Sequence, residues 1–305
     1  MRILVLGRTG YLGAHVAAGL RAVPDAQVLG AGRATGAEHG VEHRVEHRVD
    51  LATVRPEQLA KTLAPVAPDA VVNCAGATGG DAVALAEVNA RGPAVLCAAL
   101  RDAAPAARLV HLGSAAEYGP GVPDVLVTEE APTSPVGPYG ATKLAGTAAV
   151  TAAGLDAVVL RVGNPVGPGA PAASLPGRIT AMLREAGPDP AAVLRLGDLS
   201  AFRDFVDVRD VTRAVVLAAT APRPLPPVLN IGGGRAVPVR ELVRALAGRA
   251  GFRGRVEEST TGSVRSAKVS WQCSDISAAG RALGWRPAHT LDDALTALWE
   301  SDGTR

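Results

Sequence analysis

The fold is decided by the first stretch of the chain, which reads Arg2-Ile3-Leu4-Val5-Leu6-Gly7-Arg8-Thr9-Gly10-Tyr11-Leu12-Gly13. Its apolar first half predicts a buried strand over Arg2–Leu6, and a helical pattern follows over Tyr11–Val23. Glycines between a strand and a helix permit a tight turn, although such a triplet alone is weak evidence. The free N–H groups at a helix N-terminus attract an anion. The position of this turn in the first strand–helix unit therefore predicts a phosphate-binding loop.

Short apolar runs alternate with helical patterns along the chain. The predicted strands are Arg2–Leu6, Ala26–Leu29, Arg48–Leu51, Ala70–Asn73, Leu109–Leu112, Ala157–Leu160 and Val228–Ile231. The predicted helices are Tyr11–Val23, Pro56–Ala64, Ala82–Ala103 and Gly140–Ala153. Apolar strands that alternate with helices form a parallel sheet covered on both faces. The sequence thus predicts an α/β protein with a Rossmann-type doubly wound parallel sheet.

The composition and pattern of the sequence change after Arg161. Gly163–Pro176 is rich in glycine and proline and predicts irregular structure, and residues 177–200 and 235–290 predict loops with short helices. In doubly wound proteins such additions lie over the carboxyl ends of the strands, where ligands bind. We therefore expect a dinucleotide-binding domain over 1–165, to which 203–232 returns. A smaller C-terminal substrate-binding lobe would comprise 166–202 and 233–305.

The composition excludes several classes of function. The chain has 305 residues and a formal net charge of +2 with no long basic run, so we expect no nucleic-acid partner. No run of about 18 apolar residues occurs, so we expect no membrane-spanning helix. The cysteines are odd in number and far apart, which favours reduced thiols and the cytoplasm; they are Cys74, Cys97 and Cys273. His43 and His47 are four residues apart, but this spacing does not bring two rings together on a predicted strand. We therefore expect no metal.

The GxxGxxG spacing of the first turn resembles the extended branch of the short-chain dehydrogenase/reductase family, which includes the NAD-dependent epimerases and dehydratases. The resemblance implies a nicotinamide dinucleotide held by the turn residues Gly7, Arg8, Thr9, Gly10, Tyr11, Leu12 and Gly13. It implies that Asp50 and Leu51, after the third strand, lie near the adenine. It also implies that the segment after the fourth strand lines the cofactor through Asn73, Ala75 and Gly76.

The residues after the second strand bear on the choice of cofactor. An acid there would accept hydrogen bonds from a free ribose 2′-hydroxyl and favour NAD. The chain has Gly30-Ala31-Gly32-Arg33, with no acid and one arginine. A guanidinium suits a 2′-phosphate. The sequence therefore predicts NADP(H), with NAD(H) as the alternative cofactor. The plainer interpretation of Arg33 is an exposed arginine that binds no ligand.

Tyr139-Gly140-Ala141-Thr142-Lys143 forms a Tyr-x-x-x-Lys motif. A four-residue spacing places both side chains on one face of a helix. Free tyrosine ionises near pH 10, and a nearby ammonium favours its phenolate. The chain has only three tyrosines and three lysines, which makes a chance pairing improbable. In the family the lysine also binds the nicotinamide ribose, and a hydroxyl residue after the fifth strand completes the centre. That residue is Ser114, followed by Ala115, Ala116, Glu117, Tyr118 and Gly119.

Two departures from the family pattern narrow the reaction. The family's sugar-nucleotide dehydratases carry an acid directly after the catalytic hydroxyl residue, because they must remove water. Here those places hold Ala115 and Ala116, which cannot move protons. A dehydratase is therefore disfavoured. A ketoreductase, an alcohol dehydrogenase and a 4-epimerase remain.

The resemblance continues on the substrate side. Asn164 and Arg203 lie in segments that are similar to those of the family's nucleotide-sugar epimerases, where the corresponding side chains meet a diphosphate. Arg265 lies where the epimerases also have an arginine. The resemblance therefore implies that Asn164, Arg203 and Arg265 bind the substrate. Lys268 departs from the pattern, because the family has an acid there that holds the nucleotide's ribose. Either the nucleotide sits differently or the substrate is not a nucleotide sugar.

These observations favour an NADPH-dependent 4-ketoreductase of a nucleotide-activated deoxysugar, with Tyr139 as general acid. The alternatives are a 4-epimerase with tightly bound NAD and a reductase of a non-nucleotide ketone. A regulatory protein that only senses the cofactor is disfavoured, because such proteins commonly lose the tyrosine or the lysine. The resemblance also implies a homodimer built through a four-helix bundle, to which Gly140–Ala153 would contribute.

Overall fold

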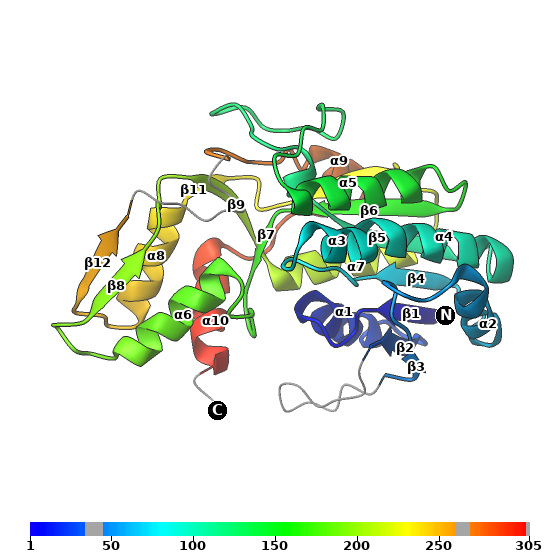
Figure 1. Cartoon of the computed structure of the whole chain (residues 1–305), viewed down its shortest axis with the longest axis horizontal. Helices are drawn as coiled ribbons and strands as arrows, with labels where there is room; N and C mark the ends of the chain where they lie inside the picture. Colours follow the sequence, from blue (N-terminus) through cyan, green and yellow to red (C-terminus); the bar gives the residue numbers. More distant parts are fainter. Residues whose placement is uncertain (34–44, 260–268, 303–305) are drawn as a thin grey trace.

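A seven-stranded parallel sheet is the main feature of the protein, whose computed structural model describes residues 1–33, 45–259 and 269–302 (Figure 1). The strand order is β10-β6-β5-β4-β1-β2-β3, and all neighbours are parallel. The strands are β1 (Arg2–Leu6), β2 (Gln27–Gly32), β3 (His47–Arg48), β4 (Ala70–Asn73), β5 (Arg108–Ser114), β6 (Ala157–Val162) and β10 (Val228–Ile231). The predicted Rossmann-type sheet is confirmed.

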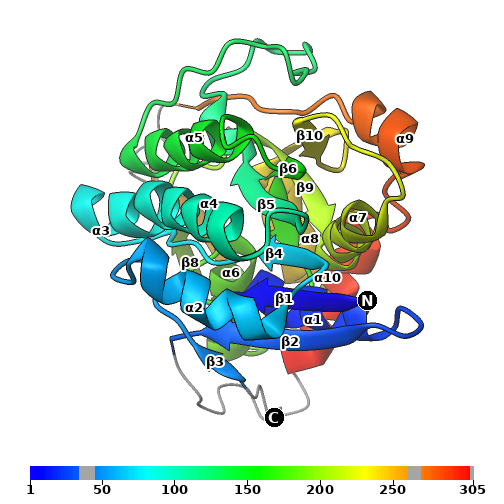
Figure 2. The same cartoon turned by 90° about the vertical axis from the view of Figure 1, so that its right-hand side faces the viewer.

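Helices cover both faces of this sheet (Figure 2). One face carries α1 (Tyr11–Arg21), α7 (Val208–Thr220) and α9 (Ser277–Leu283). The other carries α2 (Pro56–Val66), α4 (Gly92–Ala103) and α5 (Pro138–Thr151). Successive side chains of β1 alternate between the two layers, since Ile3 packs with the first set of helices and Leu4 with the second. This double burial explains why the strand is apolar at every position from Ile3 to Leu6.

The order of the strands reverses between β1 and β4. Strand β1 pairs with β2 on one side and with β4 on the other, so the connections leave the sheet in opposite directions at this point. In open α/β sheets, ligands bind outside the carboxyl ends of the strands at such a switch point. The carboxyl ends of β1 and β4 carry Gly7 and Cys74, which begin two of the predicted cofactor segments. The topology thus places both segments where a ligand is expected.

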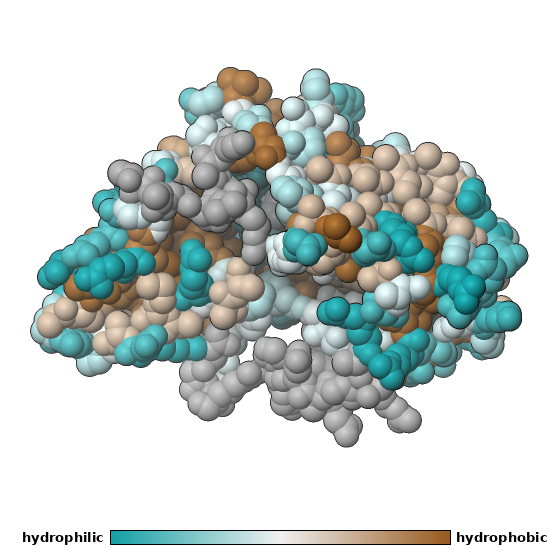
Figure 3. All heavy atoms as spheres, in the orientation of Figure 1, coloured by the Kyte–Doolittle hydropathy of each residue, from teal (hydrophilic) through white to brown (hydrophobic). Residues whose placement is uncertain are grey.

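A smaller part of the molecule has its own core, which lies to the left in Figure 1. It contains a three-stranded sheet of β11 (Ala236–Pro238), β9 (Phe202–Asp207) and β7 (Asn164–Val166), and a pair formed by β12 (Arg255–Glu258) and β8 (Val193–Leu196). Its helices are α6 (Leu175–Ala186), α8 (Val239–Arg249) and α10 (Leu291–Asp302). Hydrophilic and hydrophobic residues are interspersed over both parts of the molecule (Figure 3).

The prediction of irregular structure over Gly163–Pro176 was wrong at both ends, because β7 occupies 164–166 and α6 begins at Leu175. The small strands are three to six residues long and contain proline in β7 and β11, so their patterns are too short to stand out from loops. The strands of the large sheet match the predictions more closely. Strands β1, β4 and β10 have the predicted bounds, whereas β2 starts one residue later and ends three residues later than predicted.

One helical segment among the described residues has the length and composition of a membrane span. It runs over the 22 residues Ala82–Ala103, through α3 (Ala82–Ala86), the π-helical turn η1 (Glu87–Arg91) and α4. Half of it is buried inside the protein, where Leu96 and Leu100 contribute to the layer on one face of the sheet. This burial is typical of a core helix.

Candidate functional site

The turn after β1 is packed so closely that its glycines are required. Gly7 has a φ of +73°, and a Cβ there would lie 2.6 Å from the backbone nitrogen of Ala75, after β4. A Cβ on Gly13 would lie 2.1 Å from the carbonyl oxygen of Gly7. The Gly10 N–H donates to that same oxygen over 3.0 Å, and α1 begins at the next residue. The turn therefore presents bare backbone and a helix N-terminus at the switch point, which fits a pyrophosphate.

The side chains of the turn point in different directions. Tyr11 packs against the core of the smaller part of the molecule, and its ring meets His15 edge-on at 5.3 Å. Leu12 packs against the core of the large sheet. A Cβ on Gly32, the last residue of β2, would lie 4.0 Å from the Thr9 hydroxyl. The turn thus offers its backbone rather than these side chains to a ligand.

An ion pair lies at the end of β2, where the adenosine ribose is bound in Rossmann folds. Arg8 is buried, its side chain crosses Gly30, and its guanidinium lies 3.1 Å from a carboxylate oxygen of Glu46. The same oxygen accepts the Gly30 N–H over 2.6 Å. Burial works to raise the pKa of Glu46, but the bonds from Gly30 and Arg8 prevail and hold it below its usual value. The segment after β2 lacks an acid, as the sequence shows, but the fold brings one there from residue 46. Arg33 is exposed.

The segment after β4 is shaped by buried amides. The side-chain oxygen of Asn73 accepts the Ala75 N–H over 3.1 Å, and its nitrogen lies 3.1 Å from Nδ1 of His111. Asn73 therefore fixes the course of the backbone towards Gly76, which is exposed. After β3, Asp50 accepts the N–H of Ala52 over 3.0 Å. Leu51 is buried in the layer that contains α2 and α4.

Lys143 and the start of α5, which carries Tyr139, lie against the end of β5 and the turn after Ser114. Lys143 is buried on α5, and its Nζ donates to the carbonyl oxygen of Leu112, two residues before Ser114 on the strand. A Cβ on Gly140 would lie 2.5 Å from the Ala116 carbonyl oxygen, so the start of α5 lies directly on the turn that follows Ser114. This glycine allows the start of α5, which carries the half-buried Tyr139, to lie close to that turn.

The surroundings of Lys143 change its acidity. Burial is the largest influence and lowers the pKa of its ammonium from 10.5 to about 8, while the negative charge of Glu117 and the Cys74 thiol act in the opposite direction. The ammonium form is therefore present below about pH 8 and is lost above it. A lysine with this pKa is charged at neutral pH yet close to its titration point, a condition under which neighbouring charges control its state.

Asn89 is a further polar residue of this site that the sequence patterns do not reveal. It is fully buried in the π-helical turn η1, a type of distortion that is frequent at functional sites. Its side chain accepts the Ala77 N–H over 2.9 Å and donates to the Thr142 hydroxyl over 3.3 Å. Asn89 thus ties the segment after β4 to the helix that carries Tyr139 and Lys143. An asparagine within a mostly apolar predicted helix, between Glu87 and Arg91, was too weak a signal to single it out.

The turn after Ser114 contains one carboxylate, but it does not face a substrate. Ala115–Glu117 form a 3₁₀ turn, η2, in which the Glu117 side chain is completely buried and accepts bonds from the Ser114 N–H and from Arg161. Gln272 donates to the Ala115 carbonyl over 2.7 Å and covers the turn from the other side. Directly after Ser114, therefore, only alanine side chains are available.

The substrate-side residues lie on neighbouring strands. Asn164 on β7 is opposite Phe205 on β9, and Arg203 lies two residues before Phe205, so the pattern puts Asn164 and Arg203 on the same face of the small sheet. The Asn164 amide donates to the Asp204 carbonyl over 3.1 Å, and an Arg203 nitrogen donates to the Phe202 carbonyl over 2.7 Å. Arg265 and Lys268 lie outside the described residues.

Asp204 stabilises the junction between the two parts of the molecule through hydrogen bonds to its carboxylate. Its buried carboxylate accepts the N–H groups of Gly233, Gly234 and Ser274 over 2.6, 3.1 and 3.0 Å. Burial raises the pKa of Asp204 to about 6, against the effect of these bonds. We expect Asp204→Asn to lower the free energy of unfolding by about 2 kcal/mol, because the amide NH₂ must face one of these donors.

Chemical denaturation measures this loss. Asp198→Asn is the matched control in the same part of the molecule, because Asp198 is exposed and its carboxylate accepts the N–H of Ser200. Its denaturation midpoint should stay at the wild-type value. Equal midpoints for the two variants would show that the three bonds to Asp204 contribute nothing to stability.

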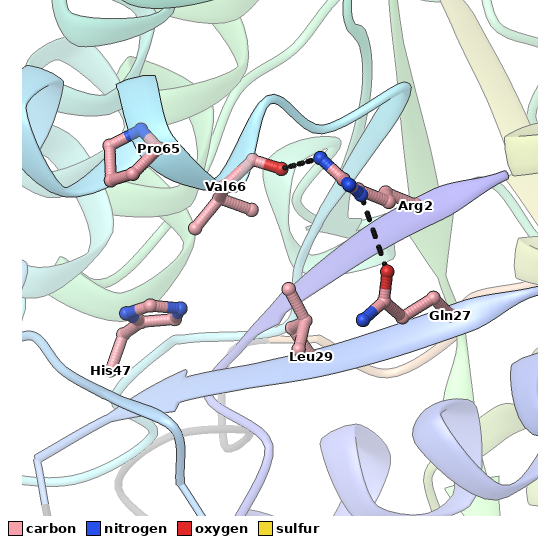
Figure 4. Close-up of a pocket in the computed structure, with 6 residues that line it drawn as sticks. All are labelled: Arg2, Gln27, Leu29, His47, Pro65 and Val66. Atoms are coloured by element: carbon pink, nitrogen blue, oxygen red, sulfur yellow. Dashed lines mark hydrogen bonds between the residues drawn. The ribbon is translucent and has the colours of Figure 1, made fainter.

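A separate hollow of about 250 Å³ lies at the opposite end of β1 (Figure 4). Arg2 lines it and donates to Gln27 and to the Val66 carbonyl, both over 3.3 Å. His47 also lines the hollow, while His43 lies outside the described residues. Among the described residues no group of three or more metal-binding side chains occurs. Because Arg2 begins β1 and the glycine turn follows the other end of this strand, the hollow is remote from the turn. The arginine that lines the hollow is already bonded within the protein.

Fold and site together define a class: a Rossmann-type dinucleotide-binding protein with a tyrosine–lysine motif at the carboxyl end of its sheet. The model of the NAD dependent epimerase/dehydratase family matches residues 3–232. The chain belongs to this family, which confirms the resemblance seen in the sequence.

The chain is similar to proteins of known activity. A dTDP-6-deoxy-L-talose 4-dehydrogenase (NAD(P)(+)) from Kitasatospora kifunensis is 42% identical over 208 residues, which are 66% of this chain and 64% of that protein. The match thus spans less than two thirds of the relative's length. The structure of MoeE5 in complex with UDP-glucuronic acid and NAD has a TM-score of 0.85 at 27% identity, covering 100% of this chain and 99% of that one. RMD from Pseudomonas aeruginosa complexed with NADPH has a TM-score of 0.83 at 25% identity, with the same coverage.

Proposed function

We propose that the protein reduces a keto group with NADPH, and that this group is C4 of a nucleotide-activated 4-keto-deoxysugar. The observation that supports the proposal is the packing of α5, which carries Tyr139 and Lys143, against the end of β5 and the turn that follows Ser114. Ala115 and Ala116 follow Ser114 and carry no ionisable group. Such a site can move one proton through Tyr139 but has no second acid to expel water.

Each residue of the centre has a defined task in this reaction. The bound dinucleotide supplies a hydride to the keto carbon. Tyr139 donates a proton to the carbonyl oxygen, on which negative charge develops, and the Ser114 hydroxyl donates a hydrogen bond to the same oxygen. The Lys143 ammonium favours the phenolate that Tyr139 becomes. Its other task is to bind the nicotinamide ribose.

The substrate would be held by the smaller part of the molecule, whose sheet is formed by β11, β9 and β7. Asn164 and Arg203 lie on one face of its sheet, and a guanidinium there suits a diphosphate. Arg265 would complete the set. The name of the Kitasatospora relative supports this class of substrate, because a sugar 4-dehydrogenase and a 4-ketoreductase catalyse the same reaction in opposite directions.

A 4-epimerase with tightly bound NAD is the second candidate, and Glu46 favours it. The carboxylate of Glu46 lies at the end of β2, where an acid would accept the hydroxyl hydrogens of an NAD ribose. One experiment separates the candidates: the purified protein is denatured and any released dinucleotide is identified by mass. Stoichiometric NAD would refute the reductase and indicate an epimerase. An empty protein that oxidises NADPH with a dTDP-4-keto-6-deoxysugar would support the reductase.

The ion pair at β2 leads to a prediction on cofactor choice. We propose that Arg8, in addition to Arg33, is a candidate partner of a 2′-phosphate, and that Glu46 competes with this phosphate for Arg8. Glu46→Gln should then tighten NADPH binding about tenfold, because it frees Arg8 and removes a repelling charge. Arg8→Met should weaken NADPH binding by about 10- to 100-fold. Both dissociation constants are measured by the change in NADPH fluorescence on binding, with NADH titrated in parallel.

Arg33→Met is the matched control for Arg8→Met. Arg33 is exposed and follows β2 directly, so it tests the interpretation drawn from the sequence alone. If only Arg33→Met weakens NADPH binding, the role proposed for Arg8 is wrong. If neither variant discriminates between NADPH and NADH, the preference for NADP(H) itself fails.

A further inference from the structure

Glu117 is a carboxylate in the interior of the catalytic centre. Its side chain is completely buried directly behind Ser114, and its two oxygens have different partners. One accepts the backbone N–H of Ser114 over 2.8 Å, and the other accepts Nε of Arg161 on β6 over 2.8 Å. A Cβ on Gly113 would lie 2.8 Å from the first oxygen, so the backbone leaves room for this carboxylate.

We propose that Glu117 is a positioning residue, which holds Ser114 in its working orientation and keeps the Lys143 ammonium charged. The inference rests on the proposed function, because it assigns Glu117 a task in the centre formed by Ser114, Tyr139 and Lys143. The first part follows from local geometry. Ser114 and Glu117 form a reciprocal capping box: Glu117 accepts the Ser114 N–H, while the Ser114 hydroxyl accepts the Ala116 N–H over 3.2 Å. The box fixes both the backbone and the side chain of Ser114.

The second part follows from charge. Lys143 is buried, and its Nζ donates a hydrogen bond to the carbonyl oxygen of Leu112, which lies two residues before Ser114 on β5. In such surroundings an ammonium loses most of the stabilisation that water gives it. Burial lowers the pKa of Lys143, and the charge of Glu117 opposes this effect. Without that charge Lys143 would lose its proton at a lower pH, and Tyr139 would lose its cationic neighbour.

Stability alone gives little reason for this ion pair. Replacing a buried pair with apolar residues of similar volume is often neutral or stabilising. Arg161 also stacks on the Tyr118 ring, 4.5 Å from its centroid, a contact that does not need Glu117. The two features that do need a carboxylate at residue 117 are the bond to Ser114 and the negative charge near Lys143.

The test uses Glu117→Gln in the full-length protein and measures the pKa of Lys143 directly. The chain has three lysines, so ¹³C-lysine NMR signals can be assigned with single Lys→Arg variants. In the wild type we expect Lys143 to titrate near pH 8. In Glu117→Gln the titration should fall by about one pH unit or more. The alkaline limb of the kcat/KM profile for NADPH-dependent reduction should move by the same amount, with little change in the KM of the keto-sugar.

Glu129→Gln is the matched control. Glu129 is another carboxylate that accepts a backbone N–H, that of Asn230 over 2.8 Å. It should leave both the lysine titration and the pH profile unchanged. If Glu117→Gln also leaves both unchanged, Glu117 is not a positioning residue. Failure of every keto-sugar as a substrate would refute the proposed function, whereas the NMR titration would still decide the role of Glu117.

A double variant, Glu117→Gln with Arg161→Met, guards against misfolding. In the single variant the amide must turn an N–H group towards either Ser114 or Arg161, both of which are donors. With methionine at 161 the glutamine oxygen is free to accept the Ser114 N–H, and the methionine can pack on Tyr118 in place of the guanidinium. The double variant should fold and still show the lower Lys143 titration. A wild-type titration in this variant would overturn the electrostatic part of the proposal.

Discussion

Tyr139→Phe should lower kcat for keto-sugar reduction by about 10²- to 10⁴-fold, the usual contribution of a positioned general acid. The loss should be confined to the chemical step. Tyr139 is half-buried at the start of α5, so phenylalanine keeps the packing of the ring and removes only the hydroxyl. The KM of the sugar and the dissociation constant of NADPH should therefore change little. Stopped-flow reduction under single-turnover conditions measures the step itself.

Tyr118→Phe is the matched control, because Tyr118 lies in the same region and also carries a hydrogen-bonded hydroxyl. Its hydroxyl donates to Asn230 over 2.8 Å, and the Arg161 guanidinium stacks on its ring. Removing it should cost stability, because Asn230 loses a partner, but not the rate of hydride transfer. The two tyrosines should thus show opposite patterns. Equal single-turnover rates in the wild type and Tyr139→Phe would refute the assignment of Tyr139 as general acid.

The parts of the site that could be predicted are those encoded by neighbouring residues. Gly13 is required by the backbone of Gly7 and Arg8, and Gly7 has a φ of +73°, so the local glycine pattern records both, although Gly7 also lies against Ala75 after β4. The four-residue spacing of Tyr139 and Lys143 is likewise a property of a single helix. The strands of the large sheet were visible because burial on both faces requires apolar residues at each position.

The parts that could not be predicted depend on residues far apart in the chain. Glu46 reaches the end of β2 from another segment, and its partner Arg8 lies 38 residues away. The sequence after β2 has no acid, so the argument for NADP(H) from Arg33 could not include this carboxylate. Asn89 and Glu117 were missed for a similar reason, because their contacts depend on how η1 and η2 meet α5 and β6.

The smaller part of the molecule shows a third limit of sequence analysis. Strands such as β7 and β11 have three residues each, and they are stable because β9 lies between them. A period of two cannot be recognised over three residues, one of which is proline. The Arg-Asp-Phe-Val segment was singled out for its resemblance to family motifs, whereas its role as the central strand β9 became visible only in the fold.

Gly13→Ala is expected to have the second large effect, and it tests whether the turn is the dinucleotide site. The added Cβ would lie 2.1 Å from the Gly7 carbonyl oxygen and 2.9 Å from the Arg8 Cα, so backbone rather than a flexible side chain must move. Such overpacking costs about 3 kcal/mol of the free energy of unfolding. A displacement of the turn by about 1 Å should also weaken NADPH and NADH binding by about 100-fold, because their phosphates depend on backbone N–H groups.

Gly248→Ala is the control that separates this steric effect from the ordinary consequence of replacing glycine in a helix. Gly248 lies in α8, and a Cβ there would meet nothing within 4 Å. Alanine at 248 should therefore stabilise the protein by about 0.5–1 kcal/mol and leave both dissociation constants unchanged. Fluorescence titration with each dinucleotide and chemical denaturation measure all six quantities on the two variants. If Gly13→Ala loses stability but binds both dinucleotides as tightly as the wild type, the glycines of the turn are needed only for packing. The cofactor would then bind elsewhere. Because the turn, Ser114 and Lys143 all lie at the carboxyl edge of one sheet, that result would also remove the reason for placing the reduction there.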